Sequence, residues 1–573
     1  MAIKSTAAKV ATIQKGYALD GPAIELGAAI VDGELRKDAP VRLPLAMMNR
    51  HGLVAGATGT GKTVTLHMMA EQLSTAGVPV FLADLKGDLS GLATAATGSE
   101  KLLARTAGIG QPWSGKTFPV EFLALGGDGN GVPVRATITS FGPILLSRVM
   151  ELNDTQESSL QLVFHFADKN NLELIDLKDL RAVIQFLISD EGKDELKELG
   201  GLAKSTAGVI LRELITLEAQ GLERFFGEPE FDAAELLRTA PDGRGVVSCL
   251  ELPTLQTKPM LFSTFLMWLL ADLFEDLPEA GDLDKPKLVF FLDEAHLLFN
   301  GASKAFLDAI TTTVRLVRSK GVGIFFVTQT PKDVPADVLG QLANRVQHAL
   351  RAYTPEDAKA LKAAVSTFPI SDYDLEETLT SAGIGEAVVT VLNENGAPTP
   401  VALTRLRAPE SVMGPSAAAL ISSTVAGSAL LPKYGTAVDG VSAYEKLTGK
   451  ASAGALPDGG TTVPDGGGAD TGGGALPDGG GTDTVDAEAR RIEEEILGRP
   501  SSRPAPRPEH QAPHPPRRRA PEQAGGGGAG DLAGALGGAL GSGLQSMARS
   551  LGTQLGRELL RGVFGTSSKR RRR

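Results

Sequence analysis

Cysteine is almost absent from this chain. Its single copy, Cys249, among 573 residues excludes a disulfide framework and a zinc site built from cysteines. One cysteine is typical of a reducing compartment, so we expect a cytoplasmic protein. Because Cys249 lies in the apolar run GVVSCLEL, we expect it to be a small buried side chain.

Long hydrophobic runs are missing as well. The most apolar stretch, Leu261 to Phe274, is 14 residues long, and acidic residues occur at 272, 275 and 276. A membrane-spanning helix needs about 20 apolar residues, so this stretch predicts a buried core helix. The N-terminal sequence MAIKSTAAKVATIQKGYALD lacks the apolar segment of a secretory signal.

The negative net charge is unevenly distributed. The whole chain carries −11, but residues 501–573 contain 13 Lys and Arg against 4 Asp and Glu, a balance of +9. The first 500 residues therefore carry −20. Any broad attraction to a polyanion is expected from the tail or from local patches that the sequence does not locate.

Composition predicts several segments along the chain. The repeated ALPDGG at 455–460 and 475–480 indicates a flexible linker that buries no core. Leucines recur every three or four positions after residue 531, which indicates one stripe of an amphipathic helix. That helix would dock on a partner or on the protein itself, or serve as a membrane-surface or nucleic-acid tail. We expect a lead-in over 1–45 with a strand pair near 24–35, a folded domain over 46–410, a margin over 411–450, a disordered Gly/Pro-rich linker over 451–530 and the helix with its basic tail over 531–573.

The folded domain has the pattern of an α/β protein. Short continuous apolar runs separated by helical segments are typical of strands covered on both faces. Residues 143–238 instead predict a run of helices inserted between the second and third core strands. The core strands are expected at 52–55, 78–84, 246–250, 288–293 and 322–328.

The segment HGLVAGATGTGKT carries the clearest motif. It fits G-x-x-x-x-G-K-[ST] at every fixed position, with an apolar run before it and a helical pattern after it. Glycines let backbone N–H groups wrap phosphate oxygens, and the following helix directs its positive end at the same anion. We expect Lys62 to bind the β- and γ-phosphates and Thr63 to bind Mg²⁺. The predicted cradle is Gly56, Ala57, Thr58, Gly59, Thr60, Gly61, Lys62 and Thr63.

Two consecutive acids follow the apolar run LVFFL. Ligands of parallel sheets lie beyond the carboxyl ends of the strands, so these acids are expected near the phosphates. We expect Asp293 to hold Mg²⁺, and Glu294 to act as general base for the attacking water. His296 has no second ligand at metal-binding spacing, and we expect a structural or supporting role.

Other polar residues extend the predicted site. Gln329 ends the strand at 322–328, and its amide can contact the γ-phosphate or the attacking water. In VFLADLKGD, Asp84, Lys86, Gly87 and Asp88 form either a strand cap and turn or a part of the active site. Arginines that could neutralise γ-phosphate charge across a subunit interface are Arg315, Arg318 and Arg351. Together these features predict a RecA-like P-loop NTPase core with a central, mostly parallel sheet, using ATP and Mg²⁺.

The strings GATGTGKT, DLKGDLSG, LVFFLDEAHLLF and RSKGVGIFFVTQTPKDVPADVLGQLANRVQHALRAYTPED resemble the HerA-like ATPases of the HerA/FtsK superfamily. The similarity covers about Asn49 to Pro409, and DLKGD lacks the proline usual in the superfamily. The resemblance implies a homohexameric ring with ATP sites between subunits. It favours Arg351, and after it Arg318, as the residue acting across the interface. It also implies Lys62, Asp293, Glu294 and Gln329 in the roles given above.

Two kinds of function follow from these patterns. The better-known members of the superfamily pump double-stranded DNA, so we expect a motor that translocates or remodels DNA. The alternative is an ATPase that acts on a protein or membrane-associated client through the basic tail. A small-molecule kinase is disfavoured by the Asp293–Glu294 pair, which suits water activation, and by the helical insertion.

Overall fold

The computed structural model describes residues 5–449 except 128, 198–199, 253–258, 282, 301 and 303. The chain divides into two compact units, and the second, Leu456–Ser550, lies outside the described residues. The linker expected over 451–530 and the helix with basic tail expected over 531–573 also lie outside them. Every described helix and strand therefore belongs to the first unit.

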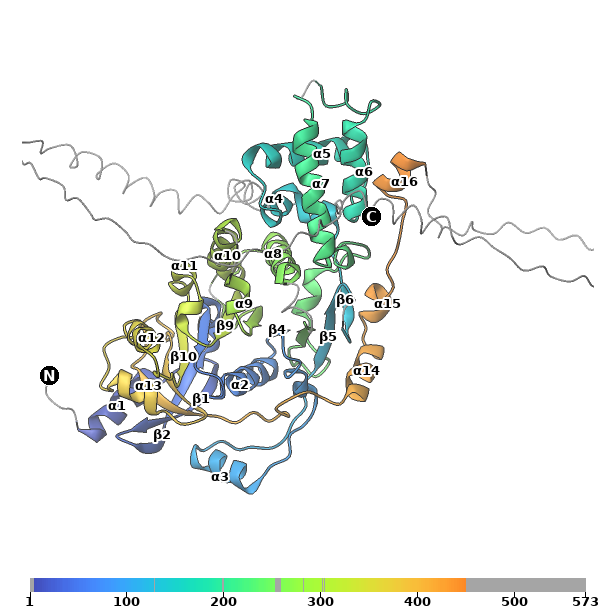
Figure 1. The fold of residues 1–573 in the computed structure, drawn as a ribbon. Coiled ribbons are helices and arrows are strands. Elements are labelled where there is room, and N and C mark those ends of the chain that lie inside the picture. The colour runs from blue at the N-terminus through green and yellow to red at the C-terminus, as the bar shows by residue number, and fades with distance from the viewer. Residues whose placement is uncertain are drawn as a thin grey trace, which may run out of the picture. The chain divides into compact units, whose positions relative to one another are not determined.

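A twelve-stranded sheet runs through the described part of the chain (Figure 1). Its parallel part has the order β10-β3-β9-β8-β4-β7-β5-β6. The five predicted core strands are confirmed, with ends shifted by at most two residues, whereas β5, β6 and β10 were not predicted. The bounds are β3 (Gly52–Ala55), β4 (Val80–Asp84), β5 (Val120–Leu125), β6 (Val132–Val134), β7 (Val247–Glu251), β8 (Leu288–Leu292), β9 (Val322–Thr328) and β10 (Asn344–His348).

Antiparallel strands continue the sheet beyond β10 in the order β11-β12-β1-β2. The strand pair expected near 24–35 is confirmed as β1 and β2, joined at Asp32 and Gly33, which both have positive φ. The sheet therefore begins within the stretch expected as a lead-in. The bounds are β1 (Ala23–Val31), β2 (Glu34–Pro44), β11 (Glu386–Thr390) and β12 (Ala402–Leu406), with α1 (Thr6–Gly16) packed on β2.

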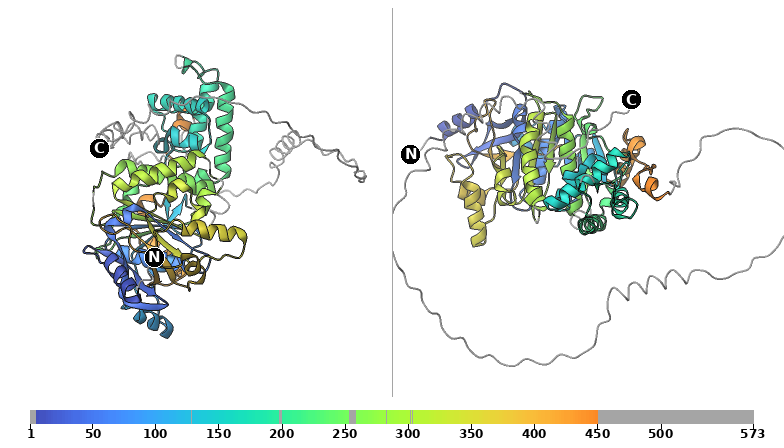
Figure 2. Two further views of the ribbon diagram at one scale, coloured as in Figure 1. Left: turned by 90° about the vertical axis from the view of Figure 1, so that its left-hand side faces the viewer. Right: turned by 90° about the horizontal axis from the view of Figure 1, so that it is seen from above.

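Helices cover both faces of the sheet (Figures 1 and 2). Adjacent residues of a strand point to opposite faces, so Phe290 and Phe291 of β8 belong to two separate hydrophobic clusters. The expected core helix is confirmed as α8, in which Trp268 is fully buried. The helices are α2 (Lys62–Thr75), α3 (Glu100–Gly108), α8 (Pro259–Asp276), α9 (His296–Phe299), α10 (Lys304–Val317), α11 (Ala336–Leu339), α12 (Pro355–Val365) and α13 (Leu375–Ser381).

The predicted helical run forms a packed group of helices between β6 and β7 (Figure 1). It does not follow β4 directly, because β5 and β6 come first in the chain. Side-chain capping boxes at Asn153 and Asp176 begin its second and third helices. The group consists of α4 (Ile138–Val149), α5 (Asp154–Lys169), α6 (Leu177–Ile188) and α7 (Lys204–Ala219).

Residues 411–449, expected only as a margin, form a folded strap that connects the sheet to the helical group. The strap contains α14 (Ala418–Ala426) packed on β5, α15 (Leu431–Tyr434) on β6 and α16 (Ala443–Thr448) on α6. Its end is fixed by the buried carboxylate of Asp179, which accepts hydrogen bonds from Ser442 Oγ and from the Tyr444 N–H at 2.9 Å. The strap thus links two parts of the fold that are distant in sequence.

Candidate functional site: a phosphate cradle at the carboxyl ends of the strands

The glycine-rich segment forms the loop between β3 and α2. Because β3 lies between β10 and β9, the loop is anchored on both sides. The Gly56 N–H donates to Thr328 O at the end of β9 (3.2 Å), and the Ala57 N–H donates to Ala349 O just after β10 (2.9 Å). Gly61 has φ 114°, a left-handed conformation that favours glycine, immediately before the first residue of α2.

Lys62 is the first residue of α2, and its side chain contacts this loop. Its side chain is 9% exposed, and Nζ donates to Gly56 O at 2.8 Å and to Ala57 O at 3.3 Å. Burial lowers the pKa of its amine, while the nearby carboxylates of Glu294 and Asp293 act in the opposite direction. A lysine held here places positive charge beside the start of a helix whose first N–H groups have no partner within the helix. This arrangement fits a phosphate chain.

The two predicted acids follow β8, next to β9 and β4 in the sheet. Asp293 is 4% exposed, and its Oδ1 accepts the Glu294 N–H at 2.9 Å. Burial raises the pKa of Asp293 to about 6. A buried carboxylate at this position, with the half-buried Thr63 in the first turn of α2, supplies oxygen ligands of the kind that Mg²⁺ prefers.

Glu294 adopts an unusual backbone conformation, with φ 46° in the left-handed region. This conformation costs a non-glycine residue on the order of 1 kcal/mol and clusters at functional sites. Burial alone would raise the pKa of its carboxyl, but the hydrogen bond and charge of Lys86 outweigh burial and lower it. The Ala295 N–H donates to Val327 O at 2.9 Å and joins this turn to β9.

Lys86 was predicted only as one reading of the segment after β4, and it contacts the proposed base directly. Its ammonium forms an ion pair with Glu294 Oε1. Asp84 has the other role considered for this segment, because its buried carboxylate caps the turn. Its Oδ1 accepts the N–H groups of Lys86 and Gly87 at 3.2 and 2.7 Å, and Oδ2 accepts that of Leu89 at 2.9 Å.

The end of β9 lies beside the cradle, as expected. Thr328 Oγ1 donates to Asp333 Oδ2 at 2.6 Å, and the Thr330 N–H donates to the same oxygen at 2.9 Å. These bonds fix the backbone on both sides of Gln329, whose side chain is exposed. A contact of Gln329 with the γ-phosphate or the attacking water stays a prediction.

His348 was not predicted, although it packs directly against the cradle. It ends β10, is fully buried, and its Nε2 lies 2.9 Å from Thr65 Oγ1 in α2. A Cβ added to Gly56 would come within 2.4 Å of His348 Cβ, so this contact requires glycine. Burial lowers the pKa of His348 to about 4, which keeps the ring neutral beside Lys62. In the sequence, His348 ends the polar run NRVQH, which has no hydrophobic strand pattern. In the structure, this run is β10 and pairs with β3.

The candidate arginines lie at opposite ends of the strands: Arg351 follows a strand, whereas Arg315 and Arg318 precede one. Arg351 follows β10 at the same edge as the cradle, is exposed, and its Nη1 donates to the Tyr353 hydroxyl at 3.3 Å. Arg318 and Arg315 are exposed and precede β9, so they lie about 20 Å away at the opposite edge. Of these three candidates, Arg351 is the one that follows a strand at the same end of the sheet as the cradle.

His296 lies beside Glu294 and belongs to no group of metal ligands among the described residues. Its Nδ1 lies 3.2 Å from Glu294 Oε2, but the angles are not those of a hydrogen bond. No group of three or more His, Cys, Asp or Glu side chains suitable for a metal occurs among the described residues.

Cys249 is buried in β7, as expected. No helix in the described ranges is long and apolar enough to cross a membrane.

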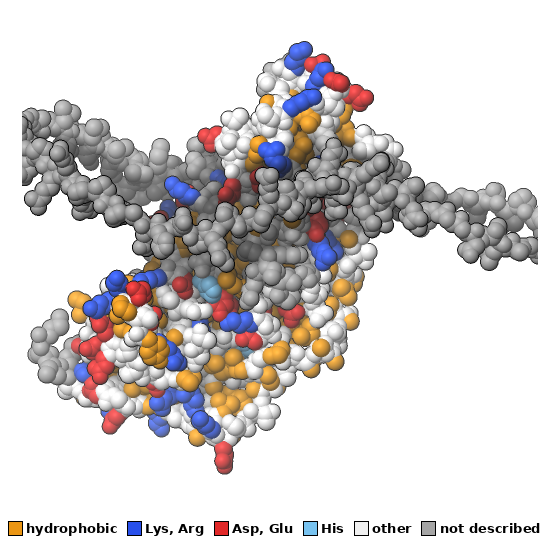
Figure 3. All heavy atoms as spheres, in the orientation of Figure 1, with side chains coloured by type: hydrophobic (Ala, Val, Ile, Leu, Met, Phe, Trp, Pro, Cys, Tyr) orange, Lys and Arg blue, Asp and Glu red, His pale blue; other side chains and the backbone are white. Residues whose placement is uncertain are grey.

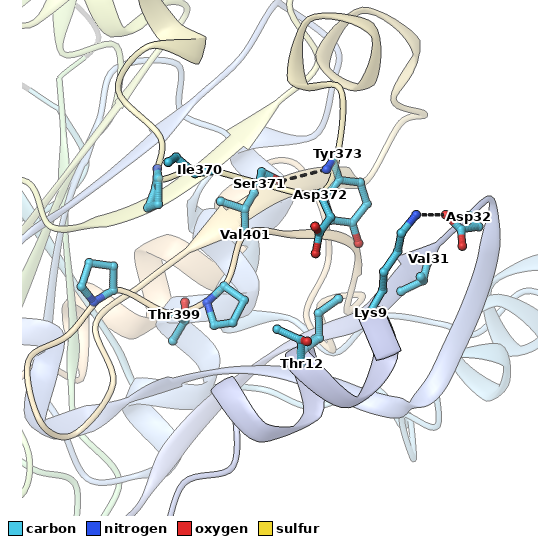
Figure 4. A pocket seen from close by; sticks show the side chains of 14 residues that line it. Lys9, Thr12, Val31, Asp32, Ile370, Ser371, Asp372, Tyr373, Thr399 and Val401 are labelled. Atoms are coloured by element: carbon cyan, nitrogen blue, oxygen red, sulfur yellow. Dashed lines mark hydrogen bonds and ion pairs between the residues drawn. The ribbon is translucent and has the colours of Figure 1, made fainter. Parts of the chain in front are cut away.

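A separate pocket of about 590 Å³ lies between α1, the loop 369–373 and the segment 398–401 (Figure 4). Lys9 and Asp32 form an ion pair of 2.6 Å at its edge, and the Tyr373 N–H donates to Ser371 Oγ at 3.0 Å. None of the predicted site residues lines it. The cradle therefore stays the predicted nucleotide site.

A parallel sheet with a glycine-rich loop after β3, a buried lysine at the start of α2 and an Asp–Glu pair after β8 defines a P-loop ATPase. The family model described as Helicase HerA-like C-terminal matches residues 30–474. The chain belongs to this family.

Two curated relatives carry the name DNA double-strand break repair helicase HerA. That of Saccharolobus solfataricus is 22% identical over 373 residues, and that of Sulfurisphaera tokodaii is 22% identical over 377 residues. The aligned parts cover 62% and 64% of this chain. The chain spans 66% and 68% of the length of these relatives.

Solved structures with a similar arrangement include the plasmid coupling protein TrwB in complex with ADP and Mg²⁺. It is 16% identical, with a TM-score of 0.47, over 70% of this chain and 93% of that chain. VirB4 of Thermoanaerobacter pseudethanolicus is 14% identical, with a TM-score of 0.42, over 68% and 97%.

Proposed function

We propose that this chain is an ATP-hydrolysing motor of the HerA/FtsK type that assembles as a homohexameric ring and translocates or remodels duplex DNA. The observation that supports it best is the convergence of Lys62, Asp293 and Glu294 in a chain of the HerA-like family. The glycine loop and Lys62 would hold the phosphates of ATP, and Thr63 and Asp293 would hold Mg²⁺. When bound, the metal would neutralise charge on the phosphates.

The remaining steps belong to the side chains of the chain itself. Glu294 accepts the proton of the attacking water, because its carboxylate is ionised and lies beside Lys62. Gln329 orients that water or contacts the γ-phosphate. We further propose that a neighbouring subunit supplies an arginine. Arg351 lies at the cradle edge in its own chain, whereas Arg318 would have to reach the cradle of a neighbour from the opposite edge.

The surface does not identify the client by itself. On the face drawn in Figure 3, acidic and basic side chains are intermixed over the described residues. The concentrated positive charge of +9 belongs to residues 501–573. Duplex DNA is proposed because both curated relatives are named as DNA repair helicases. The charge pattern alone also agrees with an acidic protein or a membrane surface.

The deciding experiment measures steady-state ATP hydrolysis with and without long duplex DNA, beside a Lys62→Ala control. We expect stimulation by DNA that disappears in the control, and a hexamer by mass photometry. DNA binding should weaken steeply with salt, since phosphate contacts release counterions. Loss of binding on deleting residues 501–573 would assign the contact to the tail.

The alternative is an ATPase that acts on a protein or membrane-associated client through the basic tail. A hydrolysis rate that needs Lys62 but is unchanged by DNA would contradict the DNA motor and favour this alternative. The next measurement would be binding of the full chain, and of the chain lacking 501–573, to vesicles containing anionic lipid.

A further inference from the structure

The carboxylate of Glu294 forms an ion pair with a lysine in the loop after a neighbouring strand. Lys86 belongs to the loop that follows β4, and β4 pairs directly with β8, which precedes Glu294. The ammonium contacts Oε1 only. Among the described residues, Oε2 is buried and receives no hydrogen bond. Oε1 of the proposed base is therefore held by Lys86, whereas Oε2 lies 3.2 Å from His296 Nδ1 and accepts no hydrogen bond among the described residues.

The backbone does not orient this carboxylate by itself. Glu294 has a left-handed backbone conformation, with φ 46°. The backbone bonds of the turn, from Ala295 N–H to Val327 O and from Glu294 N–H to Asp293 Oδ1, leave the side-chain torsions free. An added directional contact is needed to fix where the carboxylate points, and the ion pair with Lys86 supplies it.

The lysine is itself held by a rigid loop. The Asp84 carboxylate accepts four consecutive N–H groups, those of residues 86 to 89. Beyond them, Ser90 Oγ accepts the Ser416 N–H at 3.0 Å, so the first part of the strap packs against the same loop. The start of the Lys86 side chain is thereby fixed relative to β4.

We propose that Lys86 is a positioning residue for hydrolysis, which holds Glu294 Oε1 and leaves Oε2, the oxygen that accepts no hydrogen bond, to take the proton of the attacking water. This inference rests on the proposed role of Glu294 as general base. Lys86 acts through Glu294 and not on the nucleotide, so its removal should lower kcat and leave KM for ATP nearly unchanged.

The chain contains a matched control pair. Lys116 is 53% exposed and contacts Glu410, which is 14% exposed, at 2.8 Å. Lys86 is 47% exposed and Glu294 is 10% exposed. Lys116→Met therefore removes an ion pair of similar exposure from a place outside the site. Its kcat should equal that of the unmodified protein.

The experiment compares ATP hydrolysis by full-length Lys86→Met, Lys86→Arg and Lys116→Met proteins, with binding of a fluorescent ATP analogue and thermal unfolding as checks on folding. We expect kcat of Lys86→Met to fall by about tenfold, a part of what a general base contributes, with KM changed less than twofold. Lys86→Arg should recover most of the loss, because it restores a cation at Oε1.

A double-mutant cycle separates positioning from a general structural effect. In a Glu294→Gln background, Lys86→Met should cause little further loss, because residues that act as a unit are not additive. An equal fold-loss in both backgrounds, or an unchanged or raised kcat for Lys86→Met alone, would overturn the inference. If Glu294→Gln itself hydrolyses ATP normally, the proposed role of Glu294 fails first. A nearly inactive Glu294→Gln beside a fully active Lys86→Met would sink only the Lys86 inference.

Discussion

His51, just before β3, should make the fold sensitive to acid. The ring is 1% exposed. Its Nε2 lies 2.6 Å from Val314 O, and its Nδ1 lies 3.1 Å from the Ile324 N–H. A carbonyl only accepts and an N–H only donates, so Nε2 carries the proton and Nδ1 is an acceptor. Protonating Nδ1 would break the bond to β9.

The size of the effect follows from the pKa. Burial lowers the pKa of His51 to about 4, against 6.5 for a free histidine. Between pH 6.5 and about pH 4, His51 is protonated in the unfolded chain but neutral in the folded chain. The free energy of unfolding therefore falls as the pH falls. The slope reaches about 1.4 kcal/mol per pH unit, which gives about 2 kcal/mol between pH 7 and pH 5 from His51 alone.

The assay is denaturant unfolding at pH 7 and pH 5 for the unmodified protein, His51→Gln and His165→Gln. Glutamine donates and accepts without titrating, so His51→Gln should lose about 2 kcal/mol less than the unmodified protein over this range. His67 and His348 add losses of the same sign, and buried carboxyls with raised pKa such as Asp293 add the opposite sign. All of these contributions cancel in the comparison.

His165 is exposed, so His165→Gln serves as the control for the replacement of a histidine by glutamine. Equal losses for His51→Gln and the unmodified protein would refute the reasoning, because they would mean that His51 is protonated in the folded state without cost.

Three further perturbations test other parts of the structure. Asp179→Ala should lower the free energy of unfolding by about 3 kcal/mol in denaturant titrations, because it removes the acceptor of the buried Ile175 N–H and of the partly buried Tyr444 N–H. Asp190→Ala, at an exposed position, should change the free energy of unfolding by less than about 0.5 kcal/mol. Asp84→Ala should lower kcat about as much as Lys86→Met, since it releases the loop that carries Lys86; a normal kcat in steady-state assays would contradict this. Thr63→Val should raise the Mg²⁺ concentration needed for half-maximal hydrolysis by about tenfold or more, and an unchanged magnesium titration would remove Thr63 from the metal site.

The strands that are recognisable in the sequence share one property. β3, β4, β7, β8 and β9 are short apolar runs, and nearly every residue in them is buried, because helices cover both faces. β10 was not predicted, because three of its four buried residues, Asn344, Gln347 and His348, are polar. Asn344 donates to Met47 O and His51 O, and Gln347 donates to Ala55 O, so tertiary hydrogen bonds replace apolar contacts. Such a strand has no hydrophobic pattern to detect.

The predicted site residues were recognisable because their motifs are local. Lys62 and Thr63 lie within eight residues of Gly56, and Asp293 and Glu294 follow one apolar run. The strand order brings the two motifs together, because β3, β9, β8 and β4 are successive strands of the sheet. In sequence these four strands are spread over residues 52 to 328. Pairing of strands depends on long-range packing, so the contacts between motifs could not be predicted from the motifs alone.

The pair of Lys86 and Glu294 illustrates that limit. The sequence placed Lys86 after a strand and Glu294 after another, with either a turn or an active-site role for the first. The parallel register of Ala83 with Leu292 brings the two loops to the same edge of the sheet. Asp84 then takes the turn-forming role, which leaves the Lys86 side chain free to reach Glu294. The turn reading therefore holds for Asp84, and the active-site reading of Lys86 stays a prediction. The aspartate that forms the turn sets the position of the lysine that contacts the proposed base.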